Sequence, residues 1–216
     1  MQAPQTRKTE RDRRGLWLVL AAVVLAAVVG GAAYFLLRGG ESREESVAEA
    51  MRAAGCTFRT VTGLAAGTHI SDPEATPEEW TTFPPTSGPH FGQWVIWGDY
   101  EEPVRLAEAV HNLEHGGIVM YYGEDVPEDE VAAVRRFYRD DPTAMLLSPL
   151  PRLGDKIALT AWYAQVQEGE DQLAGTSQGI LAECTRFDEN AFEAFREAYR
   201  FQGPERIAPE NLEPGS

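Results

Sequence analysis

Residues 110–122 read Val-His-Asn-Leu-Glu-His-Gly-Gly-Ile-Val-Met-Tyr-Tyr, which joins the end of a helix to a strand. Apolar residues recur at helical spacing up to this stretch, and Pro103 can occupy a first helical turn, so a helix is expected from Pro103 to about His115. Gly116-Gly117 is typical of a helix end. The β-branched and aromatic run Ile118–Tyr122 then predicts a strand.

Outward from this stretch, periodicity predicts further helices and strands. Thr57–Phe91, rich in Gly, Thr and Pro, is expected to form a long loop layer. Trp94–Trp97 is a short apolar segment whose two Trp side chains are expected in the core. This order predicts an α+β fold with a small mixed sheet, flanking helices and a loop layer. The remaining expected elements are helices Glu41–Ala54, Pro127–Arg139 and Glu189–Tyr199, and strands Ala144–Leu147 and Ile157–Tyr163.

Histidine is scarce in this chain, yet three of its four histidines fall in two short, unusual phrases, one ending at His90 and one running from His111 to Gly117. The spacing of His111 and His115 places both imidazoles on one helix face, within reach of one metal ion. His90 follows a loop stiffened by prolines and supplies a third imidazole, as at catalytic zinc sites and copper sites. His69 is expected as a fourth ligand or as a partner of the ligands. The sequence therefore predicts a transition-metal site, copper or zinc.

Glu114 lies one helical turn after His111 and can orient an imidazole or act as a catalytic base. His111-x-x-Glu114-His115 also matches a zinc-peptidase pattern, in which a later glutamate, Glu189 or Glu193, would be the third ligand. A five-residue pattern is easily matched by chance, so peptidase activity is the weaker interpretation.

Methionine could add thioether ligands for copper at Met120 and Met145. Methionine more often fills a core, and Met120 lies inside an expected strand. Both side chains are therefore expected in the core.

The amino-terminal part of the chain predicts a membrane anchor. Leu16–Leu37 carries no charge and is long enough to cross a bilayer, whereas a cleaved signal peptide has a shorter apolar region. Both alternatives remain, with the anchor favoured. Basic residues concentrate in the preceding segment, so that end is expected in the cytoplasm and the rest outside. The expected division is 1–15 cytoplasmic tail, 16–38 transmembrane anchor, 39–203 extracytoplasmic domain and 204–216 Pro/Glu-rich tail.

Charge and cysteine content limit the function further. The chain has a formal net charge of −15, and because basic residues precede the apolar stretch, the outer part is more acidic still. Such a surface repels nucleic-acid backbones, so nucleic-acid binding is not expected. Cys56 and Cys184 are the two cysteines, both on the expected outer side, where a structural disulfide between them is expected.

Several phrases resemble a bacterial family, domain of unknown function 3105 (DUF3105). The main ones are Pro84–His90 and Val110–Gly117, and the resemblance extends from about Gly67 to Glu210. It implies no established reaction, but it puts five residues on family motif positions and makes a shared site the expectation. Those residues are His69, His90, His111, Glu114 and His115. The other matching phrases are Gly67–Ile70, Ser148–Pro151, Ile157–Trp162 and Ala208–Glu210.

Together these features predict a single-pass protein of the bacterial cell membrane whose outer domain binds copper or zinc in envelope metal handling. The bilayer and the metal ion are the expected partners, and the sequence does not identify any protein partner. One alternative is a hydrolytic or oxidative metalloenzyme that uses Glu114 in catalysis. Another is a metal-free structural or partner-binding module, in which the histidines bond to backbone carbonyls.

Overall fold

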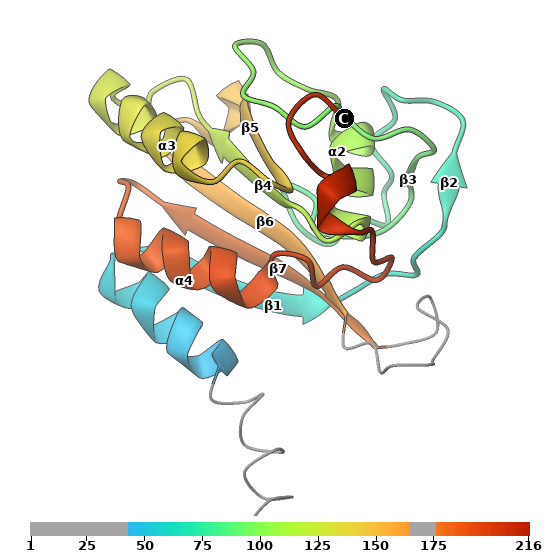
Figure 1. Cartoon of the computed structure of the whole chain (residues 1–216), viewed down its shortest axis with the longest axis horizontal. Coiled ribbons are helices and arrows are strands. Elements are labelled where there is room, and N and C mark those ends of the chain that lie inside the picture. The colour runs from blue at the N-terminus through green and yellow to red at the C-terminus, as the bar shows by residue number, and fades with distance from the viewer. Residues whose placement is uncertain (1–42, 165–175) are drawn as a thin grey trace, which may run out of the picture. The chain divides into compact units, whose positions relative to one another are not determined.

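The computed structural model describes residues 43–164 and 176–216, and their centre is a five-stranded mixed sheet (Figure 1). The strand order is β1-β7-β6-β4-β5, antiparallel throughout except for the parallel pair β4–β5. The strands are β1 Thr57–Thr62, β4 Ile118–Tyr122, β5 Met145–Pro149, β6 Ile157–Ala164 and β7 Ser177–Cys184.

Helices and loops cover opposite faces of this sheet. Alternation along β4 sends Ile118 and Met120 into a core with α3 (Glu128–Asp140) and α4 (Glu189–Tyr199). The alternate residues, Val119 and Tyr121, face a second core beneath α2 (Leu106–Glu114) and the loop layer. Figure 1 shows α3 and α4 on one side of the sheet and α2 with the loops on the other. The predicted α+β fold with a mixed sheet is confirmed.

Two strands of the five-stranded sheet were not anticipated from the sequence. Thr57–Thr62 was expected in the loop layer, but it is the edge strand β1, paired with β7 along its whole length. β7 itself, Ser177–Cys184, had no counterpart among the expected elements. α2 also begins at Leu106, after the expected Pro103, because Arg105 is extended and forms its amino-terminal cap. The expected helices Pro127–Arg139 and Glu189–Tyr199 are confirmed as α3 and α4, within one residue at each end.

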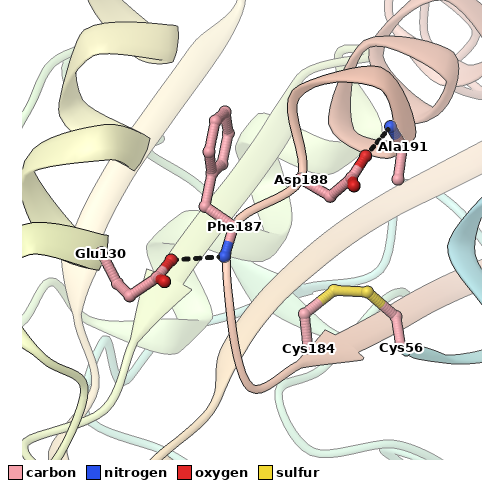
Figure 2. Close-up of a disulfide and its surroundings, with 6 residues drawn as sticks. All are labelled: Cys56, Glu130, Cys184, Phe187, Asp188 and Ala191. Atoms are coloured by element: carbon pink, nitrogen blue, oxygen red, sulfur yellow. Dashed lines mark hydrogen bonds between the residues drawn. A yellow bond between two sulfur atoms is a disulfide. The ribbon is translucent and has the colours of Figure 1, made fainter. Parts of the chain in front are cut away.

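A disulfide joins Cys56, just before β1, to Cys184 at the end of β7, as predicted (Figure 2). Beside it, the carboxylate of Asp188 accepts the Ala191 N–H at 3.0 Å and caps α4. The disulfide therefore links the edge strand β1 to β7 near the point where the chain leaves β7 and enters α4.

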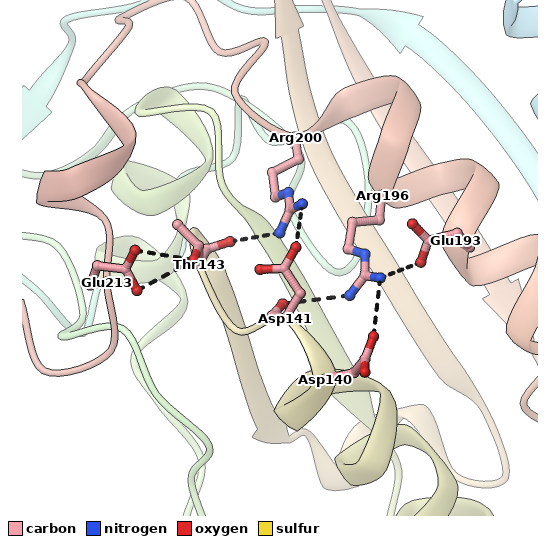
Figure 3. A network of polar contacts seen from close by, with 7 residues as sticks. All are labelled: Asp140, Asp141, Thr143, Glu193, Arg196, Arg200 and Glu213. Atoms are coloured by element: carbon pink, nitrogen blue, oxygen red, sulfur yellow. Dashed lines mark hydrogen bonds and ion pairs between the residues drawn. The ribbon is translucent and has the colours of Figure 1, made fainter.

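Arg196 of α4 and Arg200, the residue that caps its carboxyl end, connect that helix to the segment after α3 (Figure 3). Arg196 is buried, pairs with Glu193 and stacks over the ring of Phe137. Arg200 donates to the carboxylate of Asp141 at 2.6 Å and to the carbonyl of Thr143. These contacts fix α4 against the chain between α3 and β5.

The segment after α4 returns over the α2 face. Phe201 N–H donates to the Gly116 carbonyl at 2.7 Å, and Ala144 N–H donates to the Leu212 carbonyl at 2.8 Å. Leu212 is buried in the core beneath α2. The residues expected as a Pro/Glu-rich tail thus cover part of this face.

No helix within residues 43–164 and 176–216 is long and apolar enough to cross a membrane. The predicted anchor at 16–38 and the basic tail at 1–15 lie outside the described residues.

Candidate metal centre

The last turn of α2 presents three potential ligands, His111, Glu114 and His115, on one face, as their spacing predicts. The helix ends because Gly116 has a φ of 82°, a left-handed conformation that glycine adopts without strain. A side chain at Gly117 would clash with the ring of Trp97. The carbonyls at this end of the helix favour a nearby cation.

His90 reaches the same place from a braced loop. The Ser87 hydroxyl accepts the Leu64 N–H at 3.1 Å, and the Trp80 indole donates to the Pro89 carbonyl at 3.0 Å. His90 is fully buried. The loop therefore holds this imidazole in one position.

His69 is placed by a pair of two-residue strands. β2 (His69–Ile70) pairs in parallel with β3 (His90–Phe91), and the register puts His69 directly opposite His90. The two imidazole centroids are 5.0 Å apart. His69 is exposed while His90 is buried, so this side of the group opens to solvent.

The potential ligand atoms form two overlapping groups. One contains His69, His90, His111 and Glu114, and the other contains His111, Glu114, His115 and Glu205. Within each group all ligand atoms lie within 4.8 Å of one another. The structure thus brings all five predicted residues together, adds Glu205, and places Glu114 among the potential ligands.

Backbone carbonyls fix the tautomers of two histidines. Nδ1 of His90 lies 2.8 Å from the Gly88 carbonyl, and Nδ1 of His111 lies 2.9 Å from the Phe91 carbonyl. A carbonyl only accepts, so each Nδ1 must carry the hydrogen. In a neutral ring Nε2 then holds a free lone pair, the arrangement usual for metal-binding histidines.

Nε2 of His90 faces a carboxylate. Nε2 of His90 lies 3.1 Å from Oε2 of Glu114, but the two are not aligned as a hydrogen bond. Both atoms are buried and have no hydrogen-bond partner among the described residues. The other oxygen, Oε1, accepts the Gly67 N–H at 2.5 Å. Unpartnered buried polar atoms are rare, and this pair requires an explanation.

Burial sets the charges of the helix residues. It lowers the pKa of His111, and it lowers the pKa of His115 to about 4, with neighbouring His111 adding to the effect. Burial alone would raise the pKa of Glu114, but His90 and the Gly67 N–H hold it below the ordinary value. At neutral pH the two histidines are neutral and the glutamate is ionised, the states in which each binds metal.

Trp94 was expected in the core, and that prediction was wrong for this residue. It is 43% exposed, and its ring lies against His111 and His115, with centroids 5.6 and 5.0 Å away. Trp97 is in the core as expected. The buried side-chain amide of Asn112, on α2, accepts the Val95 N–H and donates to the Val95 carbonyl. These two bonds hold the segment Trp94–Trp97 against α2, with Trp94 at the surface and Trp97 in the core.

Asn112 and Glu205 are the site residues that the sequence did not reveal. Asn112 lies inside the histidine phrase, but a positioning amide has no spacing signature of its own. Glu205 N–H donates to the Glu114 carbonyl at 3.0 Å, and its carboxylate lies 3.4 Å from Nε2 of His115. Gly203 permits this approach, because a side chain there would clash with the end of α2.

The structure places neither of the glutamates proposed as the third ligand of a zinc peptidase near His111 and His115. Glu189 and Glu193 lie on α4, which packs on the other face of the sheet, and Glu193 pairs with Arg196. Met120 and Met145 are fully buried in that same core, as predicted. These side chains therefore do not join the groups on α2.

Comparison with known families gives one match. A family model described as "Protein of unknown function (DUF3105)" matches residues 73–211. No curated protein and no solved structure matches the chain.

Proposed function

The chain belongs to the DUF3105 family of proteins of unknown function, and we propose that it binds a transition metal ion, copper or zinc. The ligands in this proposal are His69, His90, His111 and Glu114, whose ligand atoms converge within 4.8 Å. The observation that carries it is the buried pair of His90 Nε2 and Glu114 Oε2, which lie at ion-pair distance and make no hydrogen bond.

A metal ion accounts for this pair. A protonated His90 would form an ion pair with the Glu114 carboxylate at 3.1 Å, whereas a neutral His90 would place two acceptors side by side, which repel unless a cation lies between them. Ligands bonded at about 2.0 to 2.2 Å to one zinc ion lie roughly 3 Å from each other, which matches the observed spacing. Hydrogen bonds from the two Nδ1 atoms to carbonyls support a structural role for the rings, but they leave Nε2 of His90 unexplained.

The donor set favours copper or zinc. Three imidazoles with one carboxylate suit either ion, and neither a thiolate nor a thioether is at hand. Both cysteines are joined in the disulfide, and the two core methionines lie on the other face of the sheet.

Envelope metal handling is the proposed setting. The uncharged stretch Leu16–Leu37, with basic residues before it, supports a single bilayer anchor with the cytoplasm on its amino-terminal side. The Cys56–Cys184 disulfide supports an oxidising location for the domain. On this proposal the histidine groups face the outside of a bacterial cell membrane.

A metalloenzyme is the second candidate, favoured by the exposure of His69. An ion held partly by an exposed ligand can retain a water or admit a substrate, as catalytic sites do. In that case Glu114 would act as a ligand, since its oxygen lies in the ligand group.

Elemental analysis of the full-length chain tests the proposal. We expect the purified protein to retain copper or zinc, and Glu114→Gln to weaken binding by at least about tenfold, since the carboxylate supplies a charged ligand. Glu189→Gln is the matched control, because it makes the same change outside both groups. Circular dichroism establishes that each variant is folded.

A folded wild-type protein that stays metal-free after incubation with Cu²⁺ and Zn²⁺ would overturn the proposal. That result would favour the metal-free structural module, in which the histidines only donate hydrogen bonds to backbone carbonyls where the loops meet α2. If metal is bound, X-ray absorption spectroscopy distinguishes a closed protein shell from one that retains a water.

A further inference from the structure

We propose that the two overlapping groups hold two metal ions, bridged by the carboxylate of Glu114. The inner ion would be bound by His69, His90 and His111, and the outer ion by His115 and Glu205. This inference rests on the proposed function and extends it from one ion to two.

His111 cannot serve both ions. Its Nδ1 bonds to the Phe91 carbonyl at 2.9 Å, so Nε2 offers one lone pair to one ion. With a single ion at the inner group, the ligand atoms of His115 and Glu205 would remain together and unused. Nε2 of His115 and Oε2 of Glu205 are 3.4 Å apart, close to the spacing of roughly 3 Å expected for two ligands of one ion.

Glu114 can serve both ions, because a carboxylate has two oxygens with two lone pairs each. Oε2 faces His90, while Oε1 accepts the Gly67 N–H and keeps a second lone pair. Two-metal sites place their ions about 3.5 to 4 Å apart. Groups that share His111 and Glu114, with all ligand atoms within 4.8 Å, are close enough for such a pair.

The surroundings favour a second positive charge. Glu114 and Glu205 bring two carboxylates, and both groups lie at the carbonyl end of α2. The ring of Trp94 lies against His115.

The experiment counts ions. The full-length chain is stripped with a chelator, saturated with Co²⁺ or Zn²⁺, desalted and analysed for metal per chain. We expect two ions per chain in the wild type, and one in both Glu205→Gln and His115→Gln. Glu210→Gln, an exposed glutamate in the same segment, is the matched control and should keep two. In the Co²⁺ form, magnetic coupling between the ions should appear in the wild type and disappear in both variants.

The outcomes separate this inference from the proposed function. No ion in the folded wild type overturns both. One ion in the wild type, unaffected by Glu205→Gln, overturns the second ion alone. Two ions in the wild type and in both variants overturn the assignment of the outer ion to His115 and Glu205.

Discussion

The two faces of the sheet differ in what they bury. The α3/α4 face buries aromatic and aliphatic side chains such as Phe192 and Phe195, with Arg196 as a buried charge. The α2 face adds buried polar side chains, among them His90, Asn112 and Glu114, to its apolar core. Burying a polar group costs free energy unless it is bonded, so the α2 face contributes less stability for its size.

This difference separates two tasks. The α3/α4 face, with the Cys56–Cys184 disulfide beside it, supplies stability to the domain. The α2 face uses that stability to hold imidazoles and a carboxylate in positions that are unfavourable without a ligand. Changes on the first face should therefore affect unfolding without affecting metal binding, whereas changes on the second should affect metal binding, with or without a loss of stability.

Removing the disulfide is the strongest test of this comparison. Replacing both Cys56 and Cys184 by serine should lower the free energy of unfolding by about 4 kcal/mol, because the link closes a loop of 128 residues. Chemical denaturation measures the loss, and reduction of the wild type should reproduce it. Metal uptake by the folded fraction should be unchanged; its loss in a folded variant would break the division between the faces.

Acidification should lower the free energy of unfolding of the metal-free protein, because the α2 face buries a histidine in its neutral form. The pKa of His115 is about 4 in the fold against 6.5 when unfolded, so between these values the unfolded chain binds the extra proton. Stability should therefore fall as the pH drops through this window, by up to about 3 kcal/mol from this residue. Denaturation at several pH values measures the slope.

His115→Gln is the variant that checks the cause of this slope. It should flatten the pH dependence without abolishing it, because burial lowers the pKa of His111 as well. An unchanged slope would mean that another group is responsible.

Asn112→Ala should affect both stability and the site. It removes two hydrogen bonds to the Val95 backbone and should lower the free energy of unfolding by about 2 kcal/mol. Trp94 should then move away from His111 and His115. The tryptophan fluorescence of the variant should therefore respond to added metal differently from that of the wild type. Asn211→Ala, at an exposed position, is the control and should do neither. Fluorescence that responds to metal as in the wild type would contradict the positioning role.

Asp188→Ala gives the smallest expected effect. The carboxylate caps α4 through Ala191 N–H, and its loss should cost about 1 kcal/mol. The same change at exposed Asp155 should cost less. Metal binding should be untouched in both, and any weakening with Asp188→Ala would show that the faces are coupled.

Periodic elements were predictable because their own residues specify them. α4 has Phe192, Phe195 and Tyr199 at helical spacing, and its bounds agree with the sequence prediction. β1 was missed because Thr57–Thr62 is half exposed and gives a weak apolar pattern, while its pairing with β7 is decided by a distant segment. Whether such a segment forms a strand depends on its tertiary contacts, and a local sequence pattern carries no information about those contacts.

The site was predictable in part for the same reason. His111, Glu114 and His115 share a helix, so their spacing alone places them together. His69 depends on a two-residue strand pair, which is too short to have a pattern, so the sequence offered it only as a further ligand or a partner of the ligands, and the family resemblance supported this. Glu205 depends on backbone contacts with the end of α2, and residues so far apart in sequence give no signal.

Those backbone contacts make position 205 suitable for redesign. Phe201 and Glu205 are fastened through main-chain bonds to Gly116 and Glu114, so the scaffold there does not depend on the Glu205 side chain. The side chain at position 205 can therefore be replaced while the main-chain hydrogen bonds that position it remain. Glu205→Cys would offer a softer ligand and shift selectivity toward cuprous copper, and Glu205→Asp would shorten the reach of a hard one. This position would let one fold be tuned across a series of metals.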